Sequence, residues 1–115
     1  MSKTVTYKGA KFAGSVTFSD PLTLDQEAAF EIANGAYKEA QQRAGTPGAA
    51  TSARAFLPAI LACVEKWKLA GIPESVTIET WPLRPRAAMI ELLAFLIGEI
   101  GKLYADSTDT TVPNA

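Results

Sequence analysis

Residues 84–106 restrict the fold of this chain more than any other segment. At about 100° per residue, their large apolar side chains fall within one arc, while Glu91, Glu99 and Lys102 lie opposite. The apolar arc comprises Met89, Ile90, Leu92, Leu93, Leu96, Ile97, Ile100, Leu103 and Tyr104. We therefore predict an amphipathic helix over residues 85–105 whose apolar side is buried in a core.

One flank of this predicted helix carries only small side chains. Ala94, Gly98 and Gly101 lie there between the apolar and the charged arcs, so the backbone of another helix can approach closely. Phe95 lies among the charges, where an isolated subunit would expose it to water. Two interpretations stay open: a contact with another subunit or partner, or tolerated glycines beside one ordinary exposed aromatic residue.

The length and charge balance limit the class of protein. A chain of 115 residues suits one domain, which we place at residues 1–106. Because 11 basic residues stand against 12 acidic ones, we expect no nucleic-acid partner and no anionic membrane surface. Residues 1–9 lack the apolar core of a signal peptide, and Glu91 and Glu99 interrupt the best apolar run. We therefore expect a soluble protein that is not secreted by this route.

The chain contains no histidine, the commonest general base and metal ligand. We therefore predict a non-enzymatic protein without a cofactor or metal. The single Cys63 excludes an internal disulfide, and its place on an apolar helix face indicates a core residue, not a nucleophile. The best remaining candidate for an enzyme site is Glu79 near Arg84 and Arg86, which has no accompanying nucleophile or metal set.

A β-hairpin is predicted over residues 3–18. Val5 and Tyr7 alternate with polar neighbours, and Val16 and Phe18 repeat the alternation after a Gly-containing connection. Its edges can add a partner strand. The alternative is that several lysines protect them from such pairing.

Two further helices are predicted, over residues 23–43 and 54–69. Thr23 and Gln26 have the spacing of a capping box at the start of the first. Pro58 indicates either that the second begins just before it or that a helix begun near Ser52 is kinked. Residues 44–52, rich in Gly, Pro and Ala, indicate a loop.

Residues 72–86 connect the last two predicted helices. Val76 and Ile78 alternate with polar residues and can form a short strand, and Pro85 suits the first helical position. Trp81 is interpreted as an anchor between the long helices, or, together with Arg84 and Arg86, as a binding hot spot for a protein partner.

The predicted fold is α+β and mostly helical. An N-terminal β-hairpin precedes three helices, of which the last two form the central packed pair. Residues 107–115 are small and polar, and we expect them to be a disordered tail.

The C-terminal half resembles a pattern found in small proteins encoded among the tail genes of long-tailed bacteriophages. The pattern has a helix ending in W-x-L-x-G-I-P, an aromatic-Pro-x-x-Pro-Arg turn, and an apolar helix ending in I-x-x-L-Y. The matching residues are Trp67, Leu69, Gly71, Ile72, Pro73, Trp81, Pro82, Pro85, Arg86, Leu96, Ile97, Glu99, Ile100, Leu103 and Tyr104. The chain is thus similar to the tail assembly chaperone family in this half.

The resemblance implies a small chaperone that coats the apolar, helical tape measure protein and helps to recruit tail tube subunits. It also implies protein partners only, and we expect the chain to form a homo-oligomer. The alternative function is a structural neck or tail component that remains in the virion.

Overall fold

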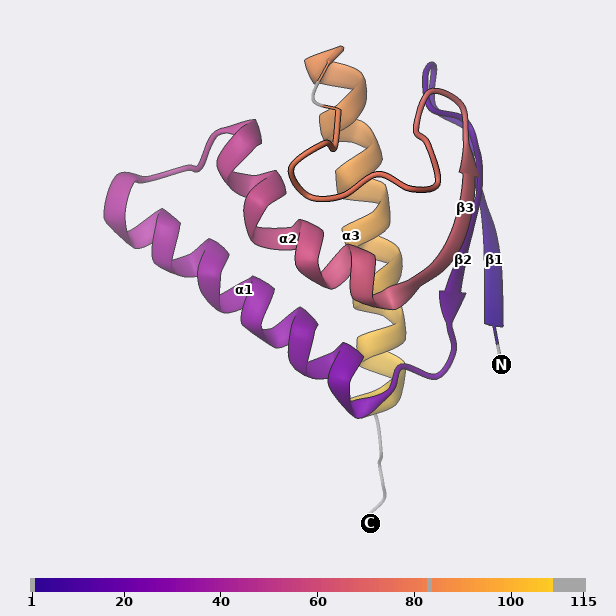
Figure 1. The fold of residues 1–115 in the computed structure, drawn as a ribbon. Coiled ribbons are helices and arrows are strands. Elements are labelled where there is room, and N and C mark those ends of the chain that lie inside the picture. Colours follow the sequence, from indigo (N-terminus) through magenta and orange to yellow (C-terminus); the bar gives the residue numbers. More distant parts are fainter. Residues whose placement is uncertain (1, 83, 109–115) are drawn as a thin grey trace.

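The computed structural model describes residues 2–82 and 84–108, and it confirms an α+β fold that begins with a β-hairpin (Figure 1). The elements in chain order are β1 (Ser2–Tyr7), β2 (Gly14–Ser19), α1 (Leu24–Ala44), α2 (Ala49–Cys63), β3 (Val64–Leu69) and α3 (Arg86–Thr108). Three helices were predicted and three are present in the described residues. The strand β3, which lies within the second predicted helix, was not predicted.

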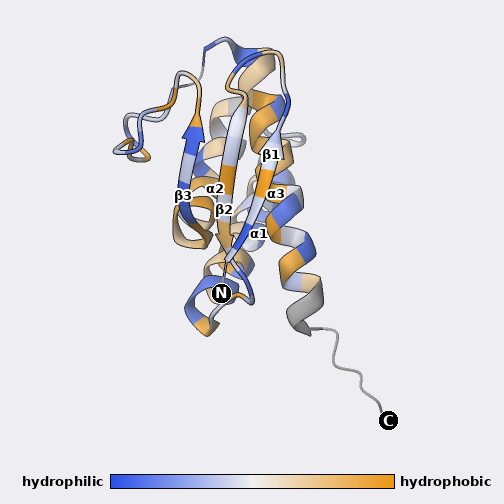
Figure 2. Ribbon diagram, turned by 90° about the vertical axis from the view of Figure 1, so that its right-hand side faces the viewer, coloured by the Kyte–Doolittle hydropathy of each residue, from blue (hydrophilic) through white to orange (hydrophobic). Residues whose placement is uncertain are grey.

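The three strands form one antiparallel sheet in the order β1-β2-β3. Val5 of β1 and Trp67 of β3 both pair with Val16 of β2, and the β2–β3 register shifts at a bulge between Thr17 and Phe18. The helices cover one face of the sheet, and Val16 and Phe18 are buried against them. Figure 2 shows the opposite face of the sheet. The third strand gives the hairpin the additional pairing that an isolated two-stranded ribbon lacks.

The prediction of one helix over residues 54–69 is wrong at both ends. The helix α2 begins at Ala49, within the predicted loop, and ends at Cys63, where the chain passes directly into β3. Pro58 therefore lies inside the helix, not in its first turn. Figure 1 shows α2 changing direction along its length, as expected for an internal proline that removes one backbone hydrogen bond.

The start of α1 has the predicted capping box. Thr23 Oγ1 accepts a hydrogen bond from the Gln26 amide at 3.2 Å, and Gln26 Oε1 accepts one from the Thr23 amide at 2.8 Å. Gln26 Nε2 also donates to the carbonyl oxygen of Ala62 at 3.0 Å. This side chain thus ties the beginning of α1 to the end of α2.

The closest helix pair is α1 with α2, which corrects the prediction that α2 and α3 form the central pair. Ala36 and Ala40 of α1 and Ala50 and Ala55 of α2 line one groove between the two helices, and such small side chains allow a close approach. Tyr37 contacts Phe56 with ring centroids 5.5 Å apart. The helix α3 lies beside α2 and next to β1 (Figure 2). Its large side chains, such as Leu96, belong to the common hydrophobic core.

The connection from β3 to α3 contains turns in place of the predicted short strand. The amide of Val76 donates to the Pro73 carbonyl at 3.3 Å, and that of Thr80 donates to the Thr77 carbonyl at 3.2 Å. The helix α3 begins at Arg86, so Pro85 precedes it by one residue instead of being its first.

Two residues of the predicted tail, 107 and 108, belong to α3. The rest of that tail, residues 109–115, lies outside the described residues.

Candidate functional site

One side of the helix α3 is buried against the rest of the fold, and the opposite side is exposed. Its buried side chains fall on one side at helical spacing: Met89, Leu92, Leu93, Leu96, Ile100 and Leu103. Ile97 and Tyr104 are partly buried beside them. The predicted apolar arc is therefore confirmed for these positions. Ile90 is the exception, because 48% of it is exposed.

Along the uncovered side of α3, beside exposed Glu91 and Lys102, runs a strip of apolar and small residues, which we call the open face. It consists of Ala87, Ile90, Ala94, Gly98, Gly101 and Ala105. All are exposed except Gly101, which is half-buried. A Cβ placed on Gly98 would meet no atom within 4 Å, whereas one placed on Gly101 would lie 3.9 Å from Phe30 Cζ of α1. The small-residue flank predicted from Ala94, Gly98 and Gly101 thus remains accessible along most of its length.

Phe95 lies at the edge of the open face and is half-buried. Its ring packs on Tyr7 of β1, with centroids 4.9 Å apart and planes tilted by 49°. The expectation that an isolated subunit leaves Phe95 in water is therefore wrong, because the β-hairpin supplies an aromatic neighbour.

Glu91 joins the same edge of α3 to the hairpin. The hydroxyl group of Tyr7 donates to Glu91 Oε1 at 3.1 Å. Burial of the phenol, followed by this hydrogen bond and the nearby negative charge, raises the pKa of Tyr7 to about 12. Tyr7 therefore stays protonated through the neutral range and holds β1 against α3.

Trp81 is buried, with 6% of its surface exposed, which is the geometry of an anchor. Its Nε1–H donates to Met89 Sδ at 3.2 Å, and its ring meets that of Trp67 edge-on at 6.0 Å between centroids. Trp81 thus joins the connection before α3 to both α3 and β3. Contact between this indole and a partner would require the connection to open.

Arg84 and Arg86 are exposed at the start of α3. Within residues 2–82 and 84–108, neither arginine forms an ion pair, and no hydrogen bond joins either one to Glu79. The three residues considered for an enzyme site are therefore not assembled into a cluster. Both guanidinium groups are available to solvent or to a partner.

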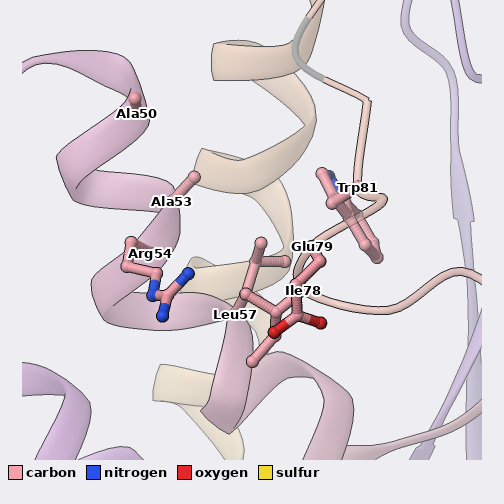
Figure 3. Close-up of a pocket in the computed structure, with 7 residues that line it drawn as sticks. All are labelled: Ala50, Ala53, Arg54, Leu57, Ile78, Glu79 and Trp81. Atoms are coloured by element: carbon pink, nitrogen blue, oxygen red, sulfur yellow. The ribbon is translucent and has the colours of Figure 1, made fainter.

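Glu79 instead faces a small cavity of about 190 Å³ between α2 and the connection (Figure 3). The cavity is lined by Ala50, Ala53, Arg54, Leu57, Ile78, Glu79 and Trp81. Arg54 and Glu79 lie at its rim from opposite sides, and the other side chains are apolar (Figure 3). In the described part of the chain, no group of three or more His, Cys, Asp or Glu side chains is placed to hold a metal ion.

Cys63 is fully buried at the end of α2, as predicted for a core residue. Its thiol lies 3.7 Å from the carbonyl oxygen of Gln26, and burial raises the pKa of the thiol to about 11. The thiolate is therefore scarce at neutral pH.

Ile90 is the site residue that sequence reasoning placed on the wrong side of α3. Its position at the margin of the apolar arc could have indicated that it is exposed. A residue at the margin is buried only if a neighbouring element extends that far around the helix.

Comparison with known proteins found no matching family model, no matching curated protein and no matching solved structure. No helix among the described residues is both long and apolar enough to cross a membrane.

Proposed function

We propose that this chain is a non-enzymatic protein-binding chaperone of bacteriophage tail assembly. In this role it coats the tape measure protein and recruits tail tube subunits in the host cytoplasm. The proposal combines the resemblance of residues 67–104 to tail assembly chaperones with the open face of α3. The open face is the observation that carries it, because a client helix needs a long surface with few protruding side chains.

The open face suits a helical, apolar client for geometric reasons. From Ala87 to Ala105 it runs for roughly 27 Å, at 1.5 Å per residue. Helices approach more closely where the contact residues are small, and Gly98 lies near the middle of the strip. Ile90 supplies an exposed apolar group near one end. A client helix laid along this surface would bury apolar area without displacing any side chain of the core.

The other predicted binding residues take different roles in this proposal. Arg84 and Arg86 lie at the N-terminal end of α3, where their charges can bind acidic groups of a client. Trp81 acts indirectly, because it anchors the segment that carries Arg84. Phe95 contributes only the edge of its ring that Tyr7 leaves uncovered.

The test is co-expression of the full chain with a tape measure protein of a long-tailed bacteriophage. We expect the tape measure protein to stay soluble and to co-purify with the chain. Gly98→Glu should abolish co-purification, because it places a long charged side chain in the middle of the open face. Gly35→Glu on α1 is the matched control, because a Cβ on Gly35 also meets no atom within 4 Å.

Two outcomes would contradict the proposal. Equal co-purification with both glutamate variants would remove the open face as the binding surface. Detection of the chain at a fixed copy number in finished phage particles would favour the structural neck or tail component instead.

A further inference from the structure

The two sides of the open face are attached to different parts of the fold. On one side, Glu91 binds Tyr7 of β1. On the other, Gly101 approaches Phe30 of α1. The open face is therefore a strip bounded by the edge of the sheet and by α1, and Figure 2 shows α3 beside β1 at that edge. A partner that fits the strip must be narrow, such as a single helix.

The small residues at positions 87, 94, 98 and 105 of the open face are spaced symmetrically about position 96. If a second copy of α3 lies antiparallel to the first, with the two-fold axis beside the turn that contains Leu96, Ala94 faces Gly98 of the partner subunit. In the same arrangement, Ala87 faces Ala105 of the partner subunit at each end. Only small side chains then meet along the centre of the contact, so the two backbones can approach closely.

The side chains that flank this centre also become complementary. Glu91 comes opposite Lys102 of the partner subunit, within one residue of register, and both lie on the same flank of the contact. On the other flank, Ile90 comes within one residue of register of Gly101 of the partner subunit, which has no side chain to oppose it. A two-fold axis repeats each of these contacts. The exposed isoleucine and the space opposite it thus occur at matching positions.

The charges distinguish this arrangement from a parallel one. Parallel copies related by a two-fold axis would place the flank that carries Glu91 and Lys102 opposite the flank that carries Ile90 and Gly101 of the partner subunit, so the contacts between Glu91 and Lys102 would be lost. In the antiparallel arrangement, the side chain of Lys102, 67% exposed, can keep its 3.0 Å ion pair with Glu99 and direct another N–H towards the partner's Glu91.

We propose that the open face binds a second copy of this chain, so that two α3 helices pack antiparallel in a two-fold symmetric dimer. The inference rests on the proposed function only in treating this surface as a protein-binding site. Its partner is a second copy of the chain, so it can be tested without any other phage protein. In the free protein, this dimer covers the surface that the client uses. Client binding then requires the two copies to separate.

The first experiment measures self-association of the full chain by sedimentation velocity over roughly 1–500 µM. We expect a monomer–dimer equilibrium whose dissociation constant rises by about tenfold or more in Gly98→Glu. Gly35→Glu should leave the dissociation constant unchanged. Both glutamates replace a glycine inside a helix, so neither variant should lower the melting temperature of the monomer. A monomer throughout this range, or equal effects of the two variants, overturns the proposal.

The second experiment tests the orientation by disulfide formation. Ala94→Cys and Gly98→Cys chains carrying different tags are mixed and oxidised. The antiparallel register predicts the mixed disulfide as the main product, whereas a parallel pair predicts each variant linked to itself. Unmodified chains and Gly35→Cys chains should not cross-link under the same conditions, because native Cys63 is fully buried. Self-linked products in excess of the mixed product would overturn the antiparallel arrangement.

The two proposals fail in different ways. If the chain is monomeric but Gly98→Glu still abolishes tape measure binding, the dimer is wrong and the proposed function stands. If the antiparallel dimer forms and the chain does not bind the tape measure protein, the proposed function is wrong and the dimer stands.

Discussion

Replacement of Trp81 by alanine tests whether the segment before α3 is held in place by one side chain. The indole is 6% exposed, donates to Met89 Sδ and packs on Trp67. It also forms one wall of the cavity of about 190 Å³ between α2 and the connection. Removal of the ring would enlarge that cavity and remove the donor to Met89 Sδ.

The expected loss of stability is large for a domain of this size. Burial of this degree gives a loss of about 3–5 kcal/mol for an aromatic-to-alanine change. With an unfolding entropy near 2.1 cal/mol/K per residue over 115 residues, the melting temperature should fall by roughly 12–20 °C. Trp81→Phe should cost less, about 1–2 kcal/mol, because it keeps most of the buried surface and loses the Nε1–H donor.

Urea denaturation followed by circular dichroism measures these differences in the free energy of unfolding. Ile32→Ala on α1 is the control, because Ile32 is 72% exposed and its truncation should change stability by no more than about 0.5 kcal/mol. If Trp81→Ala costs less than about 1 kcal/mol, the indole is not the anchor of this segment.

Three further predictions concern the two sides of α3 and its contact with β1. Leu96→Ala should cost about 2–5 kcal/mol, and Ile90→Ala less than about 1 kcal/mol; equal values would contradict the assignment of faces. Phe95→Asp should destabilise the fold by about 2–3 kcal/mol in urea denaturation, because it removes the ring contact with Tyr7; an unchanged midpoint would contradict that contact. Because the pKa of Tyr7 is about 12 when folded and about 10 when unfolded, stability should fall as pH rises above 10, and the decline should be smaller in Tyr7→Phe.

Periodicity within one segment was enough to predict the hairpin, the start of α1 and the buried side of α3. It failed for β3, where a helix was predicted to continue to Leu69. Val64 and Trp67 fit a helical face that continues from Ile60, so the helical pattern seemed uninterrupted. The competing signal was the alternation of Trp67 and Leu69 with two lysines, which is typical of a strand. Pairing with the distant β2 decides between the two, and no local pattern contains that information.

The candidate site was predictable only in part for the same reason. The small residues of the open face are visible in the sequence, because their positions depend on helical geometry alone. The environment of Phe95 is not, because Tyr7 reaches it from the opposite end of the chain. The pairing of α1 with α2 was missed because small alanines, not large apolar side chains, allow the closest approach.

The direct passage from α2 into β3 determines where this chain can accept additional residues. No loop separates Cys63 from Val64, and Val64 already pairs with Phe18. One residue inserted at this junction would shift the register of β3 and turn Trp67 to the outer face of the sheet. The loop between α1 and α2 has no such constraint, since a Cβ on Gly45 or Gly48 meets no atom within 4 Å. A tag or epitope placed in that loop should therefore preserve the fold, whereas the same insertion after Cys63 should abolish it.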